Sequence, residues 1–388
     1  MADADQQAAR SERRTSPIEL LWDLVFAFAL TQVTTLLSAH LSWSGLGHSM
    51  IVLALVWWAW SAFVWAVNAQ EEETPVLRVV LLAGMVLIFI AGLAIPRAFS
   101  SEARLFAFAY CGVRLLHLGL YADAARRGNA SARAIAGFAL TVAAGVVLLL
   151  VGSFLGGWHR AALWTAALAI DYAGPGWLTR DRLRGLQHVA VAHFAERYAL
   201  FVIICLGESI VAIAVGASGR ALTAPRVAAV AAGLLTVAGL WWTYFERAAS
   251  EAEQRIRDQA EPVLAAADAY SYLHLLLVAG IIIFAVGVKL STAHAASPLG
   301  AAARFALCGG IALYLLGHAA FRLRLGGGVN PERLAFAAAL LALAALGEGV
   351  AAWALVALAG AIVLAMCALE TAHERRRIDT RTLVATGE

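Results

Sequence analysis

The sequence predicts an all-α, polytopic membrane helix bundle with about 12 transmembrane helices, and three observations support this fold class. Of the 388 residues, 62% are hydrophobic and only 14% are charged. The mean hydropathy is +0.77, whereas soluble domains contain roughly 45–50% apolar and 25% charged residues. The apolar residues also gather in runs of about 20, the length that crosses the hydrocarbon core of a bilayer.

The apolar runs define the expected spans in order along the chain. They cover 19–41, 45–68, 76–96, 102–121, 133–154, 158–178, 192–216, 224–246, 264–289, 299–322, 331–347 and 349–370. The sixth run is broken by a Gly-Pro-Gly segment at 174–176, and only 347–349 separates the last two. An error of one span would place the two termini on opposite sides of the membrane.

The distribution of basic residues predicts the orientation of the spans. Residues 1–18 lack the apolar region and cleavage site of a signal peptide, so we expect a cytoplasmic N-terminal tail followed by a retained span. With this end in the cytoplasm, twenty of the 29 basic residues lie on the inside and seven on the outside. Both termini are therefore expected in the cytoplasm of a bacterium, with the protein in the inner membrane.

Internal sequence similarity predicts two tandem six-helix repeats, 19–178 and 192–370, followed by a basic cytoplasmic tail at 371–388. The segment ELLWDLVFAFALTQ aligns with ERYALFVIICLGES, and spans two and eight each carry a double tryptophan. Spans three and nine share LRVVLLAG and LHLLLVAG, and spans four and ten each carry a histidine near the inner end. Because each repeat has six spans, the repeats should be parallel, with a binding site between them.

The candidate transport pathway comes from this alignment. It pairs polar positions on the first helix of each repeat, and the candidates are Asp23, Thr31, Gln32, Glu208 and Ser209. An ionised carboxylate at mid-bilayer costs roughly 2.5–3.5 kcal/mol on insertion scales, which makes Glu208 a candidate functional residue. The alternative is that Glu208 is neutral or paired, for instance with Arg114, and only holds helices together.

Further polar residues are candidates for a supporting network. They are Glu19, Arg114, Asp171, His193, Glu196 and Arg197. We expect His193, Glu196 and Arg197 to interact within one helix, and Glu19 to lie at a helix N-terminus, where the dipole favours anions. Asp171 either lies beside an ion path at a broken helix or marks the end of span six. Acids outnumber bases within the spans, which favours a proton or small cation over an anion.

The sequence indicates no catalytic site, cofactor or metal centre. It contains no GxxxxGK[ST], HExxH or GxSxG motif. The four cysteines lie in apolar runs without a CxxC pair, which predicts buried thiols. The basic tail is typical of an anchor at the inner membrane surface rather than a nucleic-acid-binding arm. The expected partners are the lipid bilayer and a small cation, proton or small molecule, and the oligomeric state stays open.

Three segments resemble the bacterial low temperature requirement A (LtrA) family: SPIELLWDLVFAFALTQVT (16–34), HFAERYALFVIICLGESIVAI (193–213) and YLHLLLVAGIIIFAVG (272–287). The resemblance covers about residues 16 to 370 and implies a role in growth at low temperature, without implying a substrate. The stretch WDLVFAFALT is also similar to the opening of tandem six-helix potassium channels. Those channels carry an arginine six residues before the aspartate, where this chain has Pro17.

Three functional hypotheses follow. The first is a secondary transporter or a cation or proton pathway at the repeat interface. The second is an intramembrane enzyme acting on a lipid or isoprenoid, with Glu208, His193 and Asp171 as acid and base. The third is a structural or sensory membrane protein, in which polar residues only join helices at under about 2 kcal/mol each.

Overall fold

The computed structural model describes residues 15–68, 74–127, 132–175, 191–248, 254–256 and 258–386. Throughout these ranges the chain is helical, apart from turns and one isolated bridge between Pro298 and Ala351. The first group of helices comprises α2 (Pro17–Ala39), α3 (Trp43–Asn68), α4 (Pro75–Ala94), α5 (Ala103–Arg126), α6 (Ala132–Ser153) and α7 (Gly157–Ala173). The second comprises α9 (Val191–Ala217), α10 (Ala224–Thr243), α12 (Pro262–Ala266), η4 (Ala267–Leu273), α13 (His274–Ala293), α14 (Ala301–Arg324), α15 (Pro331–Leu346) and α16 (Ala352–Thr386).

The protein is a multipass helical membrane protein. In the described ranges ten helices are long and apolar enough to cross a bilayer, and α12, η4 and α13 together form one of them. Helix α7 has 17 residues and α15 has 16, so both are shorter than the others. A total of twelve spans therefore stays a prediction.

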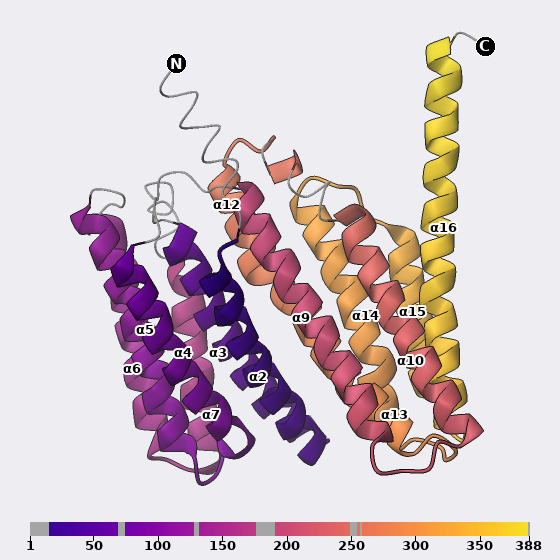
Figure 1. Ribbon diagram of the computed structural model, residues 1–388, viewed down its shortest axis with the longest axis horizontal. Coiled ribbons are helices and arrows are strands. Elements are labelled where there is room, and N and C mark those ends of the chain that lie inside the picture. Colours follow the sequence, from indigo (N-terminus) through magenta and orange to yellow (C-terminus); the bar gives the residue numbers. More distant parts are fainter. Residues whose placement is uncertain are drawn as a thin grey trace.

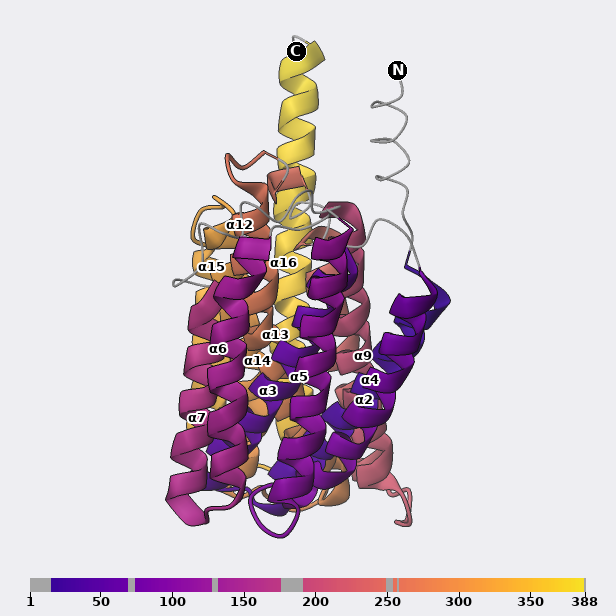
Figure 2. The same cartoon turned by 90° about the vertical axis from the view of Figure 1, so that its left-hand side faces the viewer.

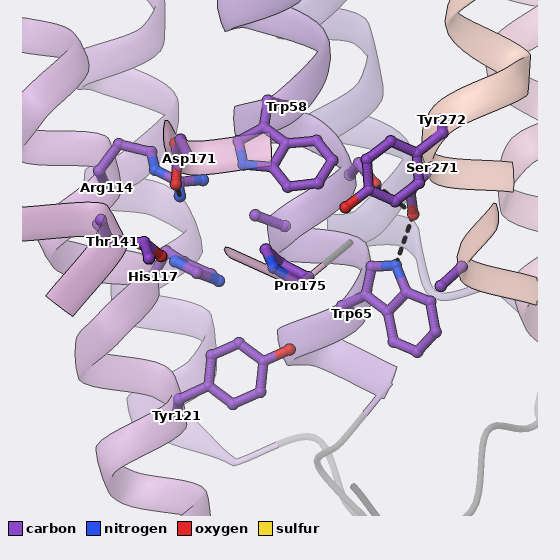
Figure 3. Close-up of a pocket in the computed structure, with 14 residues that line it drawn as sticks. Trp58, Trp65, Arg114, His117, Tyr121, Thr141, Asp171, Pro175, Ser271 and Tyr272 are labelled. Atoms are coloured by element: carbon purple, nitrogen blue, oxygen red, sulfur yellow. Dashed lines mark hydrogen bonds and ion pairs between the residues drawn. The ribbon is translucent and has the colours of Figure 1, made fainter. Parts of the chain in front are cut away.

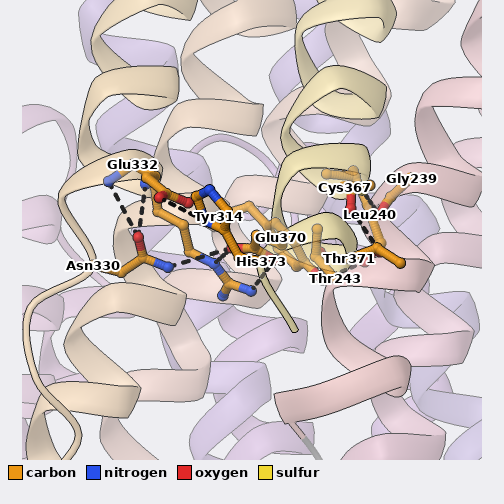
Figure 4. A network of polar contacts seen from close by, with 11 residues as sticks. Gly239, Leu240, Thr243, Tyr314, Asn330, Glu332, Cys367, Glu370, Thr371 and His373 are labelled. Carbon is orange, nitrogen blue, oxygen red and sulfur yellow. Dashed lines mark hydrogen bonds and ion pairs between the residues drawn. The ribbon is translucent and has the colours of Figure 1, made fainter. Parts of the chain in front are cut away.

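Local sequence explains where several helices begin. Proline occupies the first turn of α2, α4, α10 and α15, where its missing N–H leaves no hydrogen bond unmade. The hydroxyl of Thr74 accepts a hydrogen bond from the backbone N–H of Leu77 at the start of α4. Figure 4 shows Asn330 at the start of α15, where its side-chain oxygen accepts from the backbone N–H groups of Glu332 and Arg333. These residues place the helix ends at defined points of the chain.

The helices form two groups that lie side by side in Figure 1, and the first group stands in front of the second in Figure 2. In the first group, α2 packs on α3 and α4, α5 packs on α4 and α6, and α7 packs on α3 and α6. In the second, α9 packs on α10 and α13, α14 packs on α13 and α15, and α16 packs on α10 and α15. The groups meet where α2 and α3 contact α9 and α13.

Small residues permit the close packing of α13 and α14. A Cβ atom on Gly287 would overlap the backbone of Leu307, and one on Gly310 would overlap the backbone of Phe284. Such glycines let membrane helices approach until their backbones touch.

Helix α2 begins, and α16 ends, on the same side of the bundle (Figure 1). The 35 residues of α16 span about 52 Å at 1.5 Å per residue, and the helix projects beyond the bundle. Much of the expected separate tail at 371–388 is thus a continuation of α16 as far as Thr386.

Candidate functional site

The interface between α2 and α9 contains a buried cluster of charged groups. Arg197 on α9 donates from Nη1 to Oε2 of Glu19 (3.1 Å) and from Nη2 to Oδ1 of Asp23 (2.7 Å). His193 places Nε2 at 3.1 Å from Oε2 of Glu19, and Trp60 on α3 donates its indole N–H to Oδ1 of Asp23 (2.8 Å). We call these five residues the acid–arginine cluster. All four charged or titratable members are at most 4% exposed.

Helical spacing brings the cluster together. Glu19 and Asp23 are four residues apart on α2, as are His193 and Arg197 on α9, so each pair shares one face of its helix. The expected interaction of Glu196 with its neighbours on α9 is wrong, because Glu196 is exposed while His193 and Arg197 face α2. Adjacent residues are about 100° apart around a helix, which turns Glu196 away from the interface.

The charges of the cluster do not balance when its histidine is neutral. Two carboxylates of the cluster then share a single guanidinium. Oδ2 of Asp23 also has no hydrogen-bond partner among the described residues. Because a buried polar atom without a hydrogen-bond partner is costly, the unpartnered Oδ2 of Asp23 favours a proton or a small cation at this position.

A second acidic position lies deeper along the same interface. The hydroxyl of Thr31 on α2 donates to Oε2 of Glu208 on α9 (2.5 Å). Glu208 is 7% exposed. Thr31 follows Asp23 by eight residues, which places it about 12 Å further along the helix. The two acidic positions therefore lie on one line between α2 and α9.

The remaining pathway candidates form no side-chain hydrogen bond with either acidic position in the described ranges. Ser209 is fully buried, and its hydroxyl has no hydrogen-bond partner among the described residues. Gln32 is half-buried. Arg114 does not contact Glu208, because it donates instead to Oδ1 of Asp171 on α7 (2.8 Å).

Apolar side chains separate the two acidic positions. Phe26 on α2 and Phe201 on α9 are both fully buried. The ring of Phe201 lies 4.1 Å from that of Trp60, centroid to centroid. Phe26 lies between Asp23 and Thr31 along α2, and Phe201 lies between Arg197 and Glu208 along α9.

Sequence reasoning missed a neighbouring hydroxyl network. The Ser61 hydroxyl lies 2.6 Å from that of Tyr198, and it donates to the Ser271 hydroxyl (3.0 Å). Trp65 donates its indole N–H to the same Ser271 hydroxyl (2.8 Å). Ser271 lies on the π-helix η4, a departure from the α-helix that often occurs at functional sites. The only available signal was the position of Tyr198 directly after Arg197.

The proposed acid and base residues of an enzyme are not brought together. His193 contacts Glu19, Asp171 contacts Arg114, and Glu208 contacts Thr31. In the described ranges no three His, Cys, Asp or Glu side chains form a possible metal site. Asp171 itself is buried in an ion pair beside a cavity (Figure 3), rather than exposed at a simple helix end. All four cysteines are buried thiols outside any disulfide, as the sequence predicted.

Comparison with known proteins shows the family of this chain. The family model described as bacterial low temperature requirement A protein (LtrA) matches residues 14–368. The chain is also 31% identical over 283 residues to the uncharacterized protein RA0937 of Rhizobium meliloti (strain 1021), covering 71% of this chain and 69% of that protein. The region matched by the family model includes both acidic positions on α2 and α9. The chain therefore belongs to the bacterial low temperature requirement A (LtrA) family.

Proposed function

We propose that this protein is a secondary transporter or pathway for a proton or small cation, with its route along the interface of α2 and α9. The observation that carries the proposal is the pair of buried acidic positions on this interface, Asp23 and the Thr31–Glu208 contact. Intramembrane carboxylates are rare and typically mark ion paths or proton relays. Gln32 and Ser209 flank the deeper position and complete the proposed lining.

The packing of the helices supports the two-repeat arrangement and a total of twelve spans. When α2–α7 are matched in order with α9, α10, α13, α14, α15 and α16, six neighbouring pairs in the first group recur in the second. Under this match α2 corresponds to α9, so the proposed route runs between the first helices of the two repeats. Duplicated transporters commonly hold their substrate and coupling-ion sites at such a repeat interface.

The two repeats have diverged at matched positions. Trp57 and Trp58 of the first repeat are at most 6% exposed, whereas Trp241 and Trp242 are 41–42% exposed. Glu19 is buried, and its counterpart Glu196 is exposed. The acid–arginine cluster therefore exists once, which gives the pathway two unequal ends.

The proposal also covers the cellular location of the protein and its role in growth at low temperature. We place the protein in the bacterial inner membrane with both termini in the cytoplasm, in line with the excess of basic residues on that side. The family description supports a requirement for the protein during growth in the cold. A null strain should then grow normally at the optimum temperature and slowly in the cold.

Flux into liposomes tests the proposal. Purified protein is reconstituted, and uptake is measured under imposed H⁺, Na⁺ and K⁺ gradients, with Asp23→Asn as the variant. Asp268→Asn is the control, because Asp268 also pairs with an arginine but is only partly buried. We expect flux of one ion in the parent, at least a tenfold loss in Asp23→Asn, and parental flux in the control. Absence of flux from the folded parent under every gradient would overturn the proposal.

A further inference from the structure

Glu208 differs from the other buried acids of the described residues in its lack of a cationic partner. Five acidic side chains there are at most 8% exposed, and four of them pair with an arginine. These four are Glu19 and Asp23, which share Arg197, Asp171, which contacts Arg114, and Glu370, which contacts Arg333. Glu208 is 7% exposed and forms no ion pair within the described ranges. A buried carboxylate charge without a partner is costly, and such a group normally neutralises by taking up a proton.

The contacts of Thr31 suit a glutamate that gains and loses a proton. The Thr31 hydroxyl lies 3.2 Å from the backbone carbonyl oxygen of Ala27 and 2.5 Å from Oε2 of Glu208. A hydroxyl has a single hydrogen to donate but can also accept. When Glu208 is protonated, its O–H can donate to Thr31 while Thr31 donates to Ala27, as threonine hydroxyls in helices often do. When Glu208 is ionised, Thr31 donates to the carboxylate, so one hydroxyl serves both states without movement of a helix.

The surroundings of Glu208 do not suit a metal cation. A dehydrated cation needs several oxygen ligands in place of its hydration shell, whereas Thr31 is the only side chain in the described ranges with a hydrogen bond to Glu208. Transporters that bind metal ions often supply further ligands from the carbonyls of broken helices. Thr31 and Glu208 instead lie inside the continuous helices α2 and α9, whose carbonyls are used in helical hydrogen bonds.

Two titratable groups act electrostatically on Glu208. They are Lys289 on α13, the only lysine of the chain, and Cys205 about one turn earlier on α9. Lys289 is half-buried and forms no ion pair with Glu208. Neither group therefore compensates a buried carboxylate as the four arginine contacts do elsewhere in the bundle.

We propose that the ion of the pathway is H⁺, and that Glu208 binds it as a carboxylic acid with Thr31 as its hydrogen-bond partner in both states. This inference rests on the proposed transport function and narrows its substrate to the proton. Binding adds one H⁺ to a carboxylate oxygen of Glu208, and release removes the same H⁺, so no other bond forms or breaks.

Infrared spectroscopy tests the protonation of Glu208 without requiring flux. A neutral carboxylic acid has a C=O stretching band that an ionised carboxylate lacks. The variant is Glu208→Gln, which keeps the size of the side chain and can still hydrogen-bond Thr31. The matched control is Glu370→Gln, because Glu370 is equally buried but accepts from Nε and Nη2 of Arg333 and should be ionised. Glu196→Gln is a second control if Glu370→Gln does not fold.

At neutral pH we expect the acid band of the parent to decrease by one carboxyl group in Glu208→Gln and to stay unchanged in the controls. In liposomes that contain a pH indicator, the parent should conduct H⁺ at the same rate when Na⁺ is replaced by K⁺ or by a large organic cation. Thr31→Val should keep the acid band and lower the H⁺ flux at least tenfold, because the ionised carboxylate loses its donor.

Two results would overturn this inference and leave the transport function standing. One is an acid band that is the same in the parent and in Glu208→Gln. The other is flux of Na⁺ or K⁺ without movement of H⁺. Absence of all flux from the folded parent would instead refute the transport function, and the infrared band would still decide whether Glu208 holds a proton.

Discussion

Replacement of Arg197 by glutamine should destabilise the protein strongly. The guanidinium of Arg197 forms ion pairs with both Glu19 and Asp23, at 3.1 and 2.7 Å. Both carboxylates are at most 4% exposed, so neither can turn to water when the arginine is removed. Breaking a buried ion pair by removing one partner costs about 3–5 kcal/mol. We expect the free energy of unfolding to fall by about this amount.

The assay is reversible unfolding in mixed micelles, followed by circular dichroism as the denaturing detergent is increased. Arg324→Gln is the control, because Arg324 pairs with Asp268 where the two side chains are 34% and 17% exposed. Surface pairs contribute about 0–1 kcal/mol, so the control should stay within 1 kcal/mol of the parent. Equal, small losses in both variants would refute the claim that the cluster is a buried ion-paired unit.

Three further outcomes are expected. Gly287→Leu should prevent correct packing of α13 on α14, because the new side chain would overlap Leu307. The control Gly309→Leu should fold, since nothing lies within 4 Å of a Cβ atom at that position. Measurement of the thermal unfolding temperature distinguishes the two variants. Trp60→Phe removes the indole donor to Asp23 and should cost about 1.5–3 kcal/mol, the value for a hydrogen bond to a charged group, in the same unfolding assay. The four cysteines are buried and should resist a membrane-permeable maleimide until the protein is denatured, as mass spectrometry can measure.

The sequence predicted the helices well because each membrane span requires a run of about 20 apolar residues, which can be recognised directly in the sequence. The alignment of the two halves put Thr31 and Glu208 at equivalent positions but did not predict the contact between their side chains that the structure shows. Membrane helices have few charged residues, so the polar ones stand out even without knowledge of the fold.

Partners across helices could not be predicted in the same way. Helical periodicity indicates that His193 and Arg197 share a face, but not which helix that face meets, so Glu196 was assigned to the wrong network. The cavity beside Arg114 depends on η4, where a π-helical turn shifts the register of Ser271 and Tyr272. No pattern in the local sequence marks that shift. The double tryptophans aligned in sequence but differ in burial, because α3 lies between helices and α10 leaves part of one face uncovered.

The most direct test of the proposed pathway compares two glutamates on one helix. Glu208 is buried against Thr31, and Glu196 is exposed on the same helix α9, so Glu208→Gln and Glu196→Gln make the same chemical change in opposite surroundings. The measurement is the initial rate of ion uptake into liposomes at equal amounts of folded protein. Our account predicts at least a tenfold lower rate for Glu208→Gln and a parental rate for Glu196→Gln. Equal rates for parent, Glu208→Gln and Glu196→Gln would contradict it and leave Glu208 as a residue that only joins two helices.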